Sequence, residues 1–447
     1  MKHITILLVV ASILQGCACT GGHHGGWYDT PSSGPADTVS KFPEISDDSL
    51  LTLVQRRTFR YFWDYAHPVS GLARERLGSG DIVTSGGSGF GVMAIPVAVE
   101  RGFITREEGA ARLLKILTFL DTKADRFHGA FPHWLDGSSG RAIPFSTFDN
   151  GGDIVETALL VQGLLTVRQY FNTSDPVEGA IRDLIDQIWT AVEWDWYTRG
   201  EKVLYWHWSP NFGWEMGMQV NGWNEALIAY VLAASSPTHS ISKKVYDEGW
   251  ARHGEMANGK KFYGIRLPLG PDYGGPLFFA QYSFLGLDPR ELSDEYADYW
   301  EQNVSQTLIN YRYCVRNPKG WTGYGADVWG LTASDIPGGY AASSPTDDLG
   351  VIAPTAALSS MPYAPAESMQ ALRHYYYILG DRAFGDYGFC DAFSLEQDWF
   401  APSYLAIDQG PIIIMIENHR TGLLWDLFMR NVCILDGLDK LGFDYVK

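Results

Sequence analysis

The sequence is poor in cysteine and in basic residues, and both shortages exclude kinds of protein. Five cysteines among 447 residues are too few for a fold held together by disulfides. We expect Cys314, Cys390 and Cys433 to be mostly buried thiols, with at most one disulfide. Lys and Arg number 34 against 52 Asp and Glu, for a net charge of -18. Because nucleic-acid binding needs clustered positive charge, this balance argues against a nucleic-acid partner.

The chain also lacks the compact motifs of several enzyme classes. It has no HExxH or comparable ligand spacing for a metal ion, and no GxSxG elbow behind a strand. The glycine-rich run from Gly86 to Gly91 has neither GxGxxG spacing nor a P-loop lysine. We interpret this run as a tight loop before a helix, and we predict no metal site.

An apolar stretch near the N-terminus is too short to span a membrane permanently. Ile4 to Leu14 is followed by Gln15, Gly16 and Cys17, which resembles the lipobox of a bacterial export signal. We expect cleavage before Cys17 and lipidation of this residue. The predicted organisation is a signal peptide (1–16), a flexible tether (17–43) and one catalytic domain (44–447). The protein is expected to be exported and membrane-anchored, in the periplasm.

Helical periodicity dominates from Asp47 onward, and β-like pieces such as Lys202 to Trp208 are short. Strongly apolar helices alternate with amphipathic ones, and no motif repeats at a fixed period as in a solenoid. We predict an all-α fold, an (α/α)6 barrel of six inner and six outer helices, with long loops forming a cleft at one end. The expected helices cover about residues 50–65, 91–100, 105–120, 154–171, 176–194, 225–234, 240–253, 276–285, 294–310, 354–360, 365–379 and 412–441.

Three acidic residues stand before or within the first turn of one apolar run. Asp149, Asp153 and Glu156 are spaced i, i+4 and i+7, so on a helix they would share one face. Like charges at this spacing repel each other, although the helix dipole offsets part of the cost. A solvated acidic helix N-terminus is the alternative interpretation.

Two more acids precede apolar runs in the same way. Glu225 follows Asn224 ahead of residues 226–234, and Asp408 lies ahead of residues 412–416. Helices that are apolar on all sides are buried, so we expect these acids to gather at one end of an inner layer. Paired carboxyl groups at a cleft are typical of glycoside hydrolysis, and a gap wide enough for water favours inversion.

Aromatic residues often lie in glycine-rich or polar loops, where they suit a sugar ligand. Their rings stack on C–H faces while polar rims bind hydroxyl groups, although ordinary core packing is the alternative for each ring. The candidate substrate-binding residues are Trp208, Trp214, Trp223, Trp329, Trp399, Asn224 and Gln409.

Eight ordered segments resemble the glycoamylase-like family of bacterial proteins, which includes glycoside hydrolase family 144. They cover nearly the whole chain after the tether. The segments are Tyr61 to Trp63 with Gly71 to Arg76, Thr84 to Gly91, Asp149 to Glu156, Gly222 to Ala226 with Ser236 to His239, Gly274 to Phe278, Trp329 to Asp335, Ile352 to Ala356, and Ile407 to Pro411 with Glu417 and Asn418.

The resemblance implies an (α/α)6 barrel, no cofactor, and hydrolysis of β-1,2-glucans or their oligosaccharides. It also implies that the essential acids are Asp149, Asp153, Glu156, Glu225 and Asp408. We favour release of sophorose from the non-reducing end, because a tethered protein without a binding module suits the trimming of short oligosaccharides. An endo-β-1,2-glucanase and a glucoamylase-like hydrolase of another linkage are the alternatives.

Within this set we assign Glu225 as the general acid, since an apolar setting and nearby carboxylates would raise its pKa. Asp408 is our preferred base, with Asp153 and Glu156 as rivals. For Glu417 we favour an interior salt bridge with Arg420 over a place in the site. A monomer is expected. A tethered glycan-binding lipoprotein without activity and a polysaccharide lyase are the rival functions.

Overall fold

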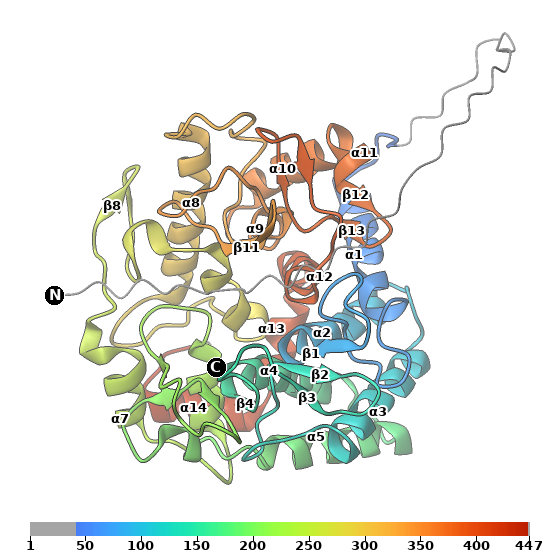
Figure 1. Cartoon of the computed structure of the whole chain (residues 1–447), viewed down its shortest axis with the longest axis vertical. Coiled ribbons are helices and arrows are strands. Elements are labelled where there is room, and N and C mark those ends of the chain that lie inside the picture. The colour runs from blue at the N-terminus through green and yellow to red at the C-terminus, as the bar shows by residue number, and fades with distance from the viewer. Residues whose placement is uncertain (1–41, 446–447) are drawn as a thin grey trace, which may run out of the picture.

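The computed structural model describes residues 42–445, and this part of the chain is mostly helical (Figure 1). The prediction of a mostly helical fold is therefore confirmed. The expected signal peptide, Cys17 and the tether up to residue 41 lie outside the described residues. Within residues 42–445, no helix combines the length and the apolar character that crossing a membrane requires.

The central layer consists of helices that are apolar on almost every face. Nearly all of their residues are buried, as expected for helices without a polar side. The labels of α2, α4, α9 and α12 lie toward the middle of Figure 1, where α2 packs against α4 and α12, and α9 packs against α12. The layer contains α2 (Ser85–Glu100), α4 (Ile154–Tyr170), α6 (Leu227–Ser235), α9 (Pro354–Leu358), α12 (Ala406–Arg420) and two 3-10 turns, η5 (Leu277–Ala280) and η6 (Tyr282–Leu285).

Helix α2 begins with the glycine-rich run that the sequence indicated to be a loop. Gly86 to Gly91 are helical and buried, so the loop interpretation is wrong. A Cβ atom on Gly89 would lie 2.4 Å from the carbonyl oxygen of Leu159 in α4. The absence of side chains therefore lets α2 and α4 pack at close range, and this contact outweighs the low helix propensity of glycine.

Amphipathic helices cover the central layer. α1 packs against α2 and α12, α3 against α2 and α5, α8 against η5, α10 against α9, and α14 against α6. Thr105 and Glu108 form a reciprocal capping box that fixes the start of α3. These helices are α1 (Asp47–Trp63), α3 (Arg106–Thr122), α5 (Pro176–Thr190), α8 (Tyr299–Arg316), α10 (Pro365–Tyr377) and α14 (Val432–Leu441).

Three expected helices differ in the structure. Residues 240–253 form only α7 (Lys243–Val245), the π-helical turn η2 (Tyr246–Trp250) and the 3-10 turn η3 (Arg252–Gly254). Residues 276–285 form two 3-10 turns, η5 and η6, which are separated by Gln281. The expected helix 412–441 is three helices, α12, α13 (Leu423–Met429) and α14, since Gly422 with φ 76° ends the first and Asn431 caps the last. The remaining helical pieces are α11 (Gly380–Ala383), η1 (Trp196–Thr198) and η4 (Asp272–Gly274).

Short antiparallel strands connect the helices and account for the β-like piece noted in the sequence. One sheet has three strands in the order β1 (Ile82–Thr84), β2 (Trp134–Asp136) and β3 (Ala142–Ile143). The others are pairs: β4 (Gly152–Asp153) with β6 (His207–Trp208), β5 (Leu204–Tyr205) with β7 (Gln219–Val220), β8 (Lys261–Phe262) with β9 (Ile265–Arg266), β10 (Ala333–Ile336) with β11 (Gly339–Ala342), β12 (Phe384–Gly385) with β13 (Gly388–Phe389), and β14 (Phe393–Ser394) with β15 (Trp399–Phe400).

The C-terminal end of α12 carries a buried ion pair that differs from the expected one. Glu417 pairs with Arg101, which caps α2, at 2.7 Å, and Arg420 pairs with Asp48 of α1 at 2.6 Å. The expected pair between Glu417 and Arg420 is therefore wrong, because each residue pairs with a different neighbouring helix. Glu417 belongs to this packing contact and stands apart from the acids at the other end of α12.

The three cysteines within the described residues are free. Cys314 and Cys390 are buried and Cys433 is partly exposed. The expectation of mostly buried thiols is confirmed, and no disulfide joins them.

Candidate active site

The starts of α2, α4 and α12 meet at one end of the central layer. The amide of Gly86 donates a hydrogen bond to Glu156 at 2.7 Å, which joins α2 to α4. A Cβ atom on Gly87 would lie 2.7 Å from the Cβ atom of Ala406, the first residue of α12. Acids from different parts of the sequence are therefore brought to the same end.

Two hydroxyl groups bring further acids to this end. Thr355 at the start of α9 donates to the carbonyl oxygen of Asp408 at 2.7 Å. Ser283 in η6 donates to the carbonyl oxygen of Glu225, just before α6. The backbone of Glu225 is thus held by η6, and the backbone of Asp408 is held by α9.

Asp149, Asp153 and Glu156 surround two histidines that the sequence prediction missed. His133 Nδ1 lies 3.2 Å from Asp153 Oδ2 and 3.8 Å from Asp149 Oδ2, and its Nε2 lies 3.9 Å from Glu156 Oε1. His207 Nε2 lies 3.3 Å from Asp149 Oδ2 and 3.7 Å from Asp153 Oδ2. The structure therefore brings the three predicted acids together around a pair of imidazoles.

Local backbone structure explains why Asp153 points into this cluster. It is the N-cap of α4, where its Oδ1 accepts hydrogen bonds from the amides of Val155 and Glu156, both at 2.9 Å. The pairing of β4 with β6 places Asp153 opposite His207. One carboxyl oxygen thus holds the helix start, while the other faces the histidines.

The charges in the cluster follow from burial and from these contacts. Burial opposes the charged form of His133, but Glu156, Asp153 and Asp149 raise its pKa to about 10. Burial and the Asp153 charge raise the pKa of Asp149 to about 7. Burial would raise the pKa of Asp153, yet the hydrogen bond from His133 and the nearby His207 lower it. At neutral pH the cluster therefore contains an imidazolium beside an ionised Asp153.

His207 and Glu156 are shifted mainly by burial. Burial lowers the pKa of His207 to about 4, which keeps this imidazole neutral. Burial also raises the pKa of Glu156, although the imidazolium of His133 and the amide of Gly86 oppose this shift. Carboxyl groups in one small volume thus titrate differently, as acid and base roles require.

Glu225 stands close enough to this cluster to be affected by its charges. Burial raises the pKa of Glu225 to about 7, and the carboxylates of Glu156 and Asp153 add to the shift. Asn224 stabilises the turn before α6, because its Oδ1 accepts the amide of Ala226 at 2.9 Å. Glu225 can therefore hold a proton near neutral pH.

Asp408 belongs to a second group of carboxyls, which contains residues that the sequence prediction did not select. Its carboxyl group lies within hydrogen-bonding reach of Asp391, and Asp391 Oδ2 accepts the amide of Asp335 at 2.7 Å. Asp335 in turn pairs with Arg76 at 2.9 Å. Burial and the neighbouring Asp391 raise the pKa of Asp408 well above its usual range.

Tyr282 links Glu225 to Asp408. Its hydroxyl group lies 3.5 Å from Asp408 Oδ1. Burial raises the pKa of this phenol well above its usual value, and the charges of Asp408 and Glu225 both contribute. The two assigned catalytic acids are thus within electrostatic range of one hydroxyl group, and Glu225 is within range of the Asp153 cluster.

Three of the candidate substrate-binding residues are buried in positions that a sugar cannot reach. Trp329 is fully buried and Trp223 is 5% exposed, with its indole nitrogen bound to Gln306 at 2.8 Å. Gln409 is also buried and donates to the carbonyl oxygen of Phe389 at 2.9 Å. The expectation that these three residues contact sugar is corrected, because close packing leaves a ligand no access to them.

Trp208, Trp214 and Trp399 are partly exposed. Trp208 lies in a cluster of rings with His128 and Trp196, at centroid distances of 5.5 Å. Side chains alternate along a strand, so Trp208 and the neighbouring His207 point to opposite faces of β6. Trp208 is therefore directed away from the acids, and Trp399 lies on the separate strand β15.

Two rings that the sequence prediction did not select lie beside the acids. Phe145 stacks on His133 with centroids 4.1 Å apart, and Trp134 contacts the same imidazole edge-on at 5.9 Å. Both rings are partly exposed. A carboxylate cluster with an adjacent aromatic ring is an arrangement that suits a sugar.

His133, Asp149 and Asp153 could also hold a metal ion. Each offers one ligand atom, and these atoms lie within 4.8 Å of one another. The imidazolium of His133 already provides the positive charge that a cation would bring to the two carboxyls. The expectation of a metal-free site stays a prediction.

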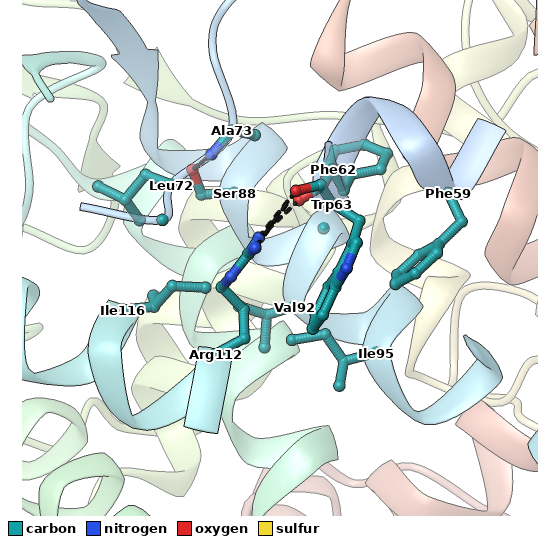
Figure 2. A pocket seen from close by; sticks show the side chains of 12 residues that line it. Phe59, Phe62, Trp63, Leu72, Ala73, Ser88, Val92, Ile95, Arg112 and Ile116 are labelled. Atoms are coloured by element: carbon teal, nitrogen blue, oxygen red, sulfur yellow. Dashed lines mark hydrogen bonds between the residues drawn. The ribbon is translucent and has the colours of Figure 1, made fainter. Parts of the chain in front are cut away.

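A small cavity lies elsewhere, between α1, α2 and α3 (Figure 2). Arg112 points across it toward the carbonyl oxygens of Phe62 and Trp63, to which it donates at 3.4 Å and 3.2 Å. Its guanidinium also lies 4.2 Å from the centre of the Trp63 ring. None of the candidate acids lines this cavity, so it belongs to the packing of these helices.

Comparisons with known proteins place the chain in a family. The family model described as "Glycoamylase: Putative glucoamylase" matches residues 217–432. A solved structure from Bacteroides uniformis ATCC 8492 with the same description is 58% identical, and the match covers 90% of this chain and 98% of that one, with a TM-score of 0.89. The chain belongs to the glycoamylase family.

Other relatives in the glycoamylase family carry more specific names. An endo-β-1,2-glucanase from Chitinophaga pinensis is 54% identical, with 90% of this chain and 99% of that chain covered and a TM-score of 0.88. An exo β-1,2-glucooligosaccharide sophorohydrolase (non-reducing end) from Parabacteroides distasonis is 47% identical over 439 residues, which is 93% of this chain. The match spans only 61% of the length of that relative.

Proposed function

We propose that this protein is a glycoside hydrolase of family 144 that cleaves β-1,2-glucosidic bonds and releases sophorose from the non-reducing end. The names of its relatives support hydrolysis of this linkage. One structural observation carries the proposal: η6 joins the two acids, because Ser283 donates to the carbonyl oxygen of Glu225 and the hydroxyl group of the adjacent Tyr282 lies 3.5 Å from Asp408 Oδ1. Glycoside hydrolysis requires two neighbouring carboxyl groups with different pKa values, one that donates a proton and one that accepts a proton.

In the proposed reaction, Glu225 is the general acid and Asp408 is the general base. Glu225 gives its proton to the glycosidic oxygen while the bond from this oxygen to the anomeric carbon breaks. A water molecule attacks that carbon from the opposite face, and its proton passes to Asp408, so the anomeric configuration inverts. Asp153 and Glu156 bind sugar hydroxyls in this scheme and are the alternative bases.

The packing supports an (α/α)6 barrel as the finer description of the fold. The inner elements are α2, α4, α6, the η5 and η6 pair, α9 and α12, and each is covered by one of α1, α3, α5, α8, α10 and α14. We further propose that residues 44–447 form one catalytic domain with its cleft at the acid-bearing end. The lipid anchor at Cys17, the periplasmic location and the monomeric state belong to the same proposal.

The decisive experiment is incubation of the protein with α- and β-linked glucans of several linkages, in the presence of a chelator. We expect sophorose as the first product of β-1,2-glucans, with the inverted anomeric configuration, and no loss of activity on removal of metal ions. Mixed products of many lengths from the start would indicate an endo-β-1,2-glucanase. Binding of a glucan without release of any sugar would indicate a glycan-binding lipoprotein instead.

A further inference from the structure

Asp391 and Asp408 bring two carboxyl groups together in the interior. Asp408 lies in the first turn of α12 and Asp391 lies between β13 and β14, and each residue is 1% exposed. The two carboxyl groups lie within hydrogen-bonding reach of each other, and one oxygen of each is buried without a partner among the described residues. An ionised carboxyl group can only accept, so a hydrogen bond between them forms only when the pair holds a proton.

The remaining contacts locate that proton. Asp391 Oδ2 accepts the amide of Asp335 at 2.7 Å. Asp391 Oδ1 and Asp408 Oδ2 are buried and receive no hydrogen bond from any N–H or O–H donor in residues 42–445. These two oxygens are therefore the ones left to share a proton. Asp408 Oδ1 lies on the other side, 3.5 Å from the hydroxyl group of Tyr282.

The groups that face the pair oppose a second negative charge. Asp335 and Glu75 are carboxylates, and the single guanidinium of Arg76 pairs with both of them, at 2.9 Å each. The other titratable neighbours are the phenols of Tyr61, Tyr282 and Tyr340, and burial raises the pKa of each. Burial and Asp335 raise the pKa of Asp391 itself to about 7. Like-charge pairs in such a setting keep one proton between them.

We propose that Asp391 is a positioning residue that shares one proton with Asp408 and so directs the second oxygen of Asp408 toward the attacking water. The inference rests on the proposed function, in which Asp408 is the base. In the resting pair the proton lies between Oδ2 of Asp408 and Oδ1 of Asp391, and the pair carries one negative charge. When the water attacks, its O–H bond breaks and its proton passes to Oδ1 of Asp408, while the shared proton moves from Oδ2 of Asp408 to Oδ1 of Asp391. Both carboxyl groups are then neutral. The effect falls on kcat, because binding of the sugar does not use Asp391.

The first test asks whether the proton is shared, and it needs no substrate. In protein labelled with ¹³C at the aspartate carboxyls, infrared spectra separate protonated from ionised groups. At about pH 9 the label on Asp149, whose pKa is about 7, reports an ionised group. Wild-type protein should retain one protonated aspartate, and Asp391→Asn and Asp408→Asn should each lose it, because an asparagine partner adds no second negative charge. A protonated aspartate that persists in Asp391→Asn, or is absent from the wild type, would overturn the proposal.

The second test asks whether the shared proton matters for catalysis. Asp391→Asn keeps a hydrogen-bond donor beside Asp408, so we expect kcat to fall on the order of 10-fold with KM nearly unchanged, and Asp391→Ala to lose on the order of 100-fold. The matched control is Asp294→Asn, a carboxylate that accepts the phenols of Tyr246 and Tyr299 at 2.5 and 3.0 Å. This control should keep the infrared band and kcat.

Wild-type kcat in both Asp391 variants would overturn the positioning role. A wild-type protein that released no sugar from any glucan would overturn the proposed function. In that case the infrared comparison would still decide whether Asp391 and Asp408 share a proton.

Discussion

The amide of Gly86 donates a hydrogen bond to Glu156 at 2.7 Å, so the first turn of α2 holds a carboxyl group of α4. A Cβ atom on residue 86 would lie 2.6 Å from Glu156 Oε2, closer than any ordinary contact. Glycine at this position therefore allows a helix N-terminus to approach an acid that the dipole favours there.

Replacement of this glycine should disturb the site more than the fold. In Gly86→Ala the new methyl group must displace the carboxyl group of Glu156, and we expect kcat/KM to fall by about 100-fold. Gly179→Ala is the matched control, because Gly179 lies within α5 and a Cβ atom there meets only Arg182, at 3.9 Å. That variant should keep its activity and gain up to about 1 kcal/mol of stability. Equal kcat/KM values for the two variants would contradict the role of Gly86.

The general-acid assignment predicts a pH dependence. Glu225 must be protonated to act, and its pKa is raised to about 7, so kcat/KM should fall as the pH rises through about 7. Glu225→Gln should lower kcat by about 100- to 10,000-fold at all pH values. A profile with the same alkaline limb after this substitution would assign that limb to another group.

The same residue predicts a stability effect with a defined sign. A carboxyl group whose pKa is raised on folding contributes stability that is fully present below its unfolded pKa and is lost as the pH rises through about 7. Glu225→Gln should therefore melt at or above the wild-type temperature at about pH 8, and this advantage should vanish at about pH 4. Thermal unfolding at the two pH values checks this.

His133 predicts a loss of stability in the same direction but at a higher pH. Its pKa is raised to about 10, so its charged form contributes stability that is fully present below about pH 6.5 and is lost only as the pH rises through about 10. His133→Asn should thus be less stable than the wild type at neutral pH. It should also lose activity, because the imidazolium that lowers the pKa of Asp153 is removed. His239→Asn is a suitable comparison, since His239 pairs with the exposed Asp195 at 3.0 Å. If the two variants melt alike, the charge of His133 has been misassigned.

Two aromatic substitutions should distinguish a sugar-binding ring from a ring that only packs in the core. Phe145→Ala should raise KM several-fold, because Phe145 is the partly exposed ring stacked on His133. Trp329→Ala should instead lower the free energy of unfolding by about 3 to 5 kcal/mol with little change in KM, since Trp329 is fully buried. Steady-state kinetics and chemical denaturation of both variants test this division. A raised KM in Trp329→Ala alone would reverse the assignment.

The sequence predicted correctly those helices that contain a long, continuous apolar run. The apolar run at 154–171 corresponds closely to α4 (Ile154–Tyr170). A helix that is buried on all sides is apolar along its whole length, so it can be recognised from its own residues alone. The glycine-rich run at the start of α2 was misread because its helical state depends on Leu159 of another helix. Residues 276–285 were misread because an apolar run alone does not distinguish a helix from consecutive 3-10 turns.

The acids of the candidate site could be selected for a similar reason. Asp153 and Asp408 stand at starts of apolar helices, where a charged residue is conspicuous. His133 and Asp391 lie in irregular segments with no periodic pattern around them. His133 and Asp391 come to lie beside the acids through tertiary contacts, and these cannot be predicted from a single segment of the sequence.

The pairing of α2 with α12 has a consequence for biosynthesis. Arg101 and Glu417 are 316 positions apart in the chain, yet they form one buried contact at 2.7 Å. The ribosome must therefore complete most of the polypeptide before the apolar surface of α2 meets this partner. Until then the apolar segments of the nascent chain lack part of their final packing, and such exposed surface is prone to aggregate.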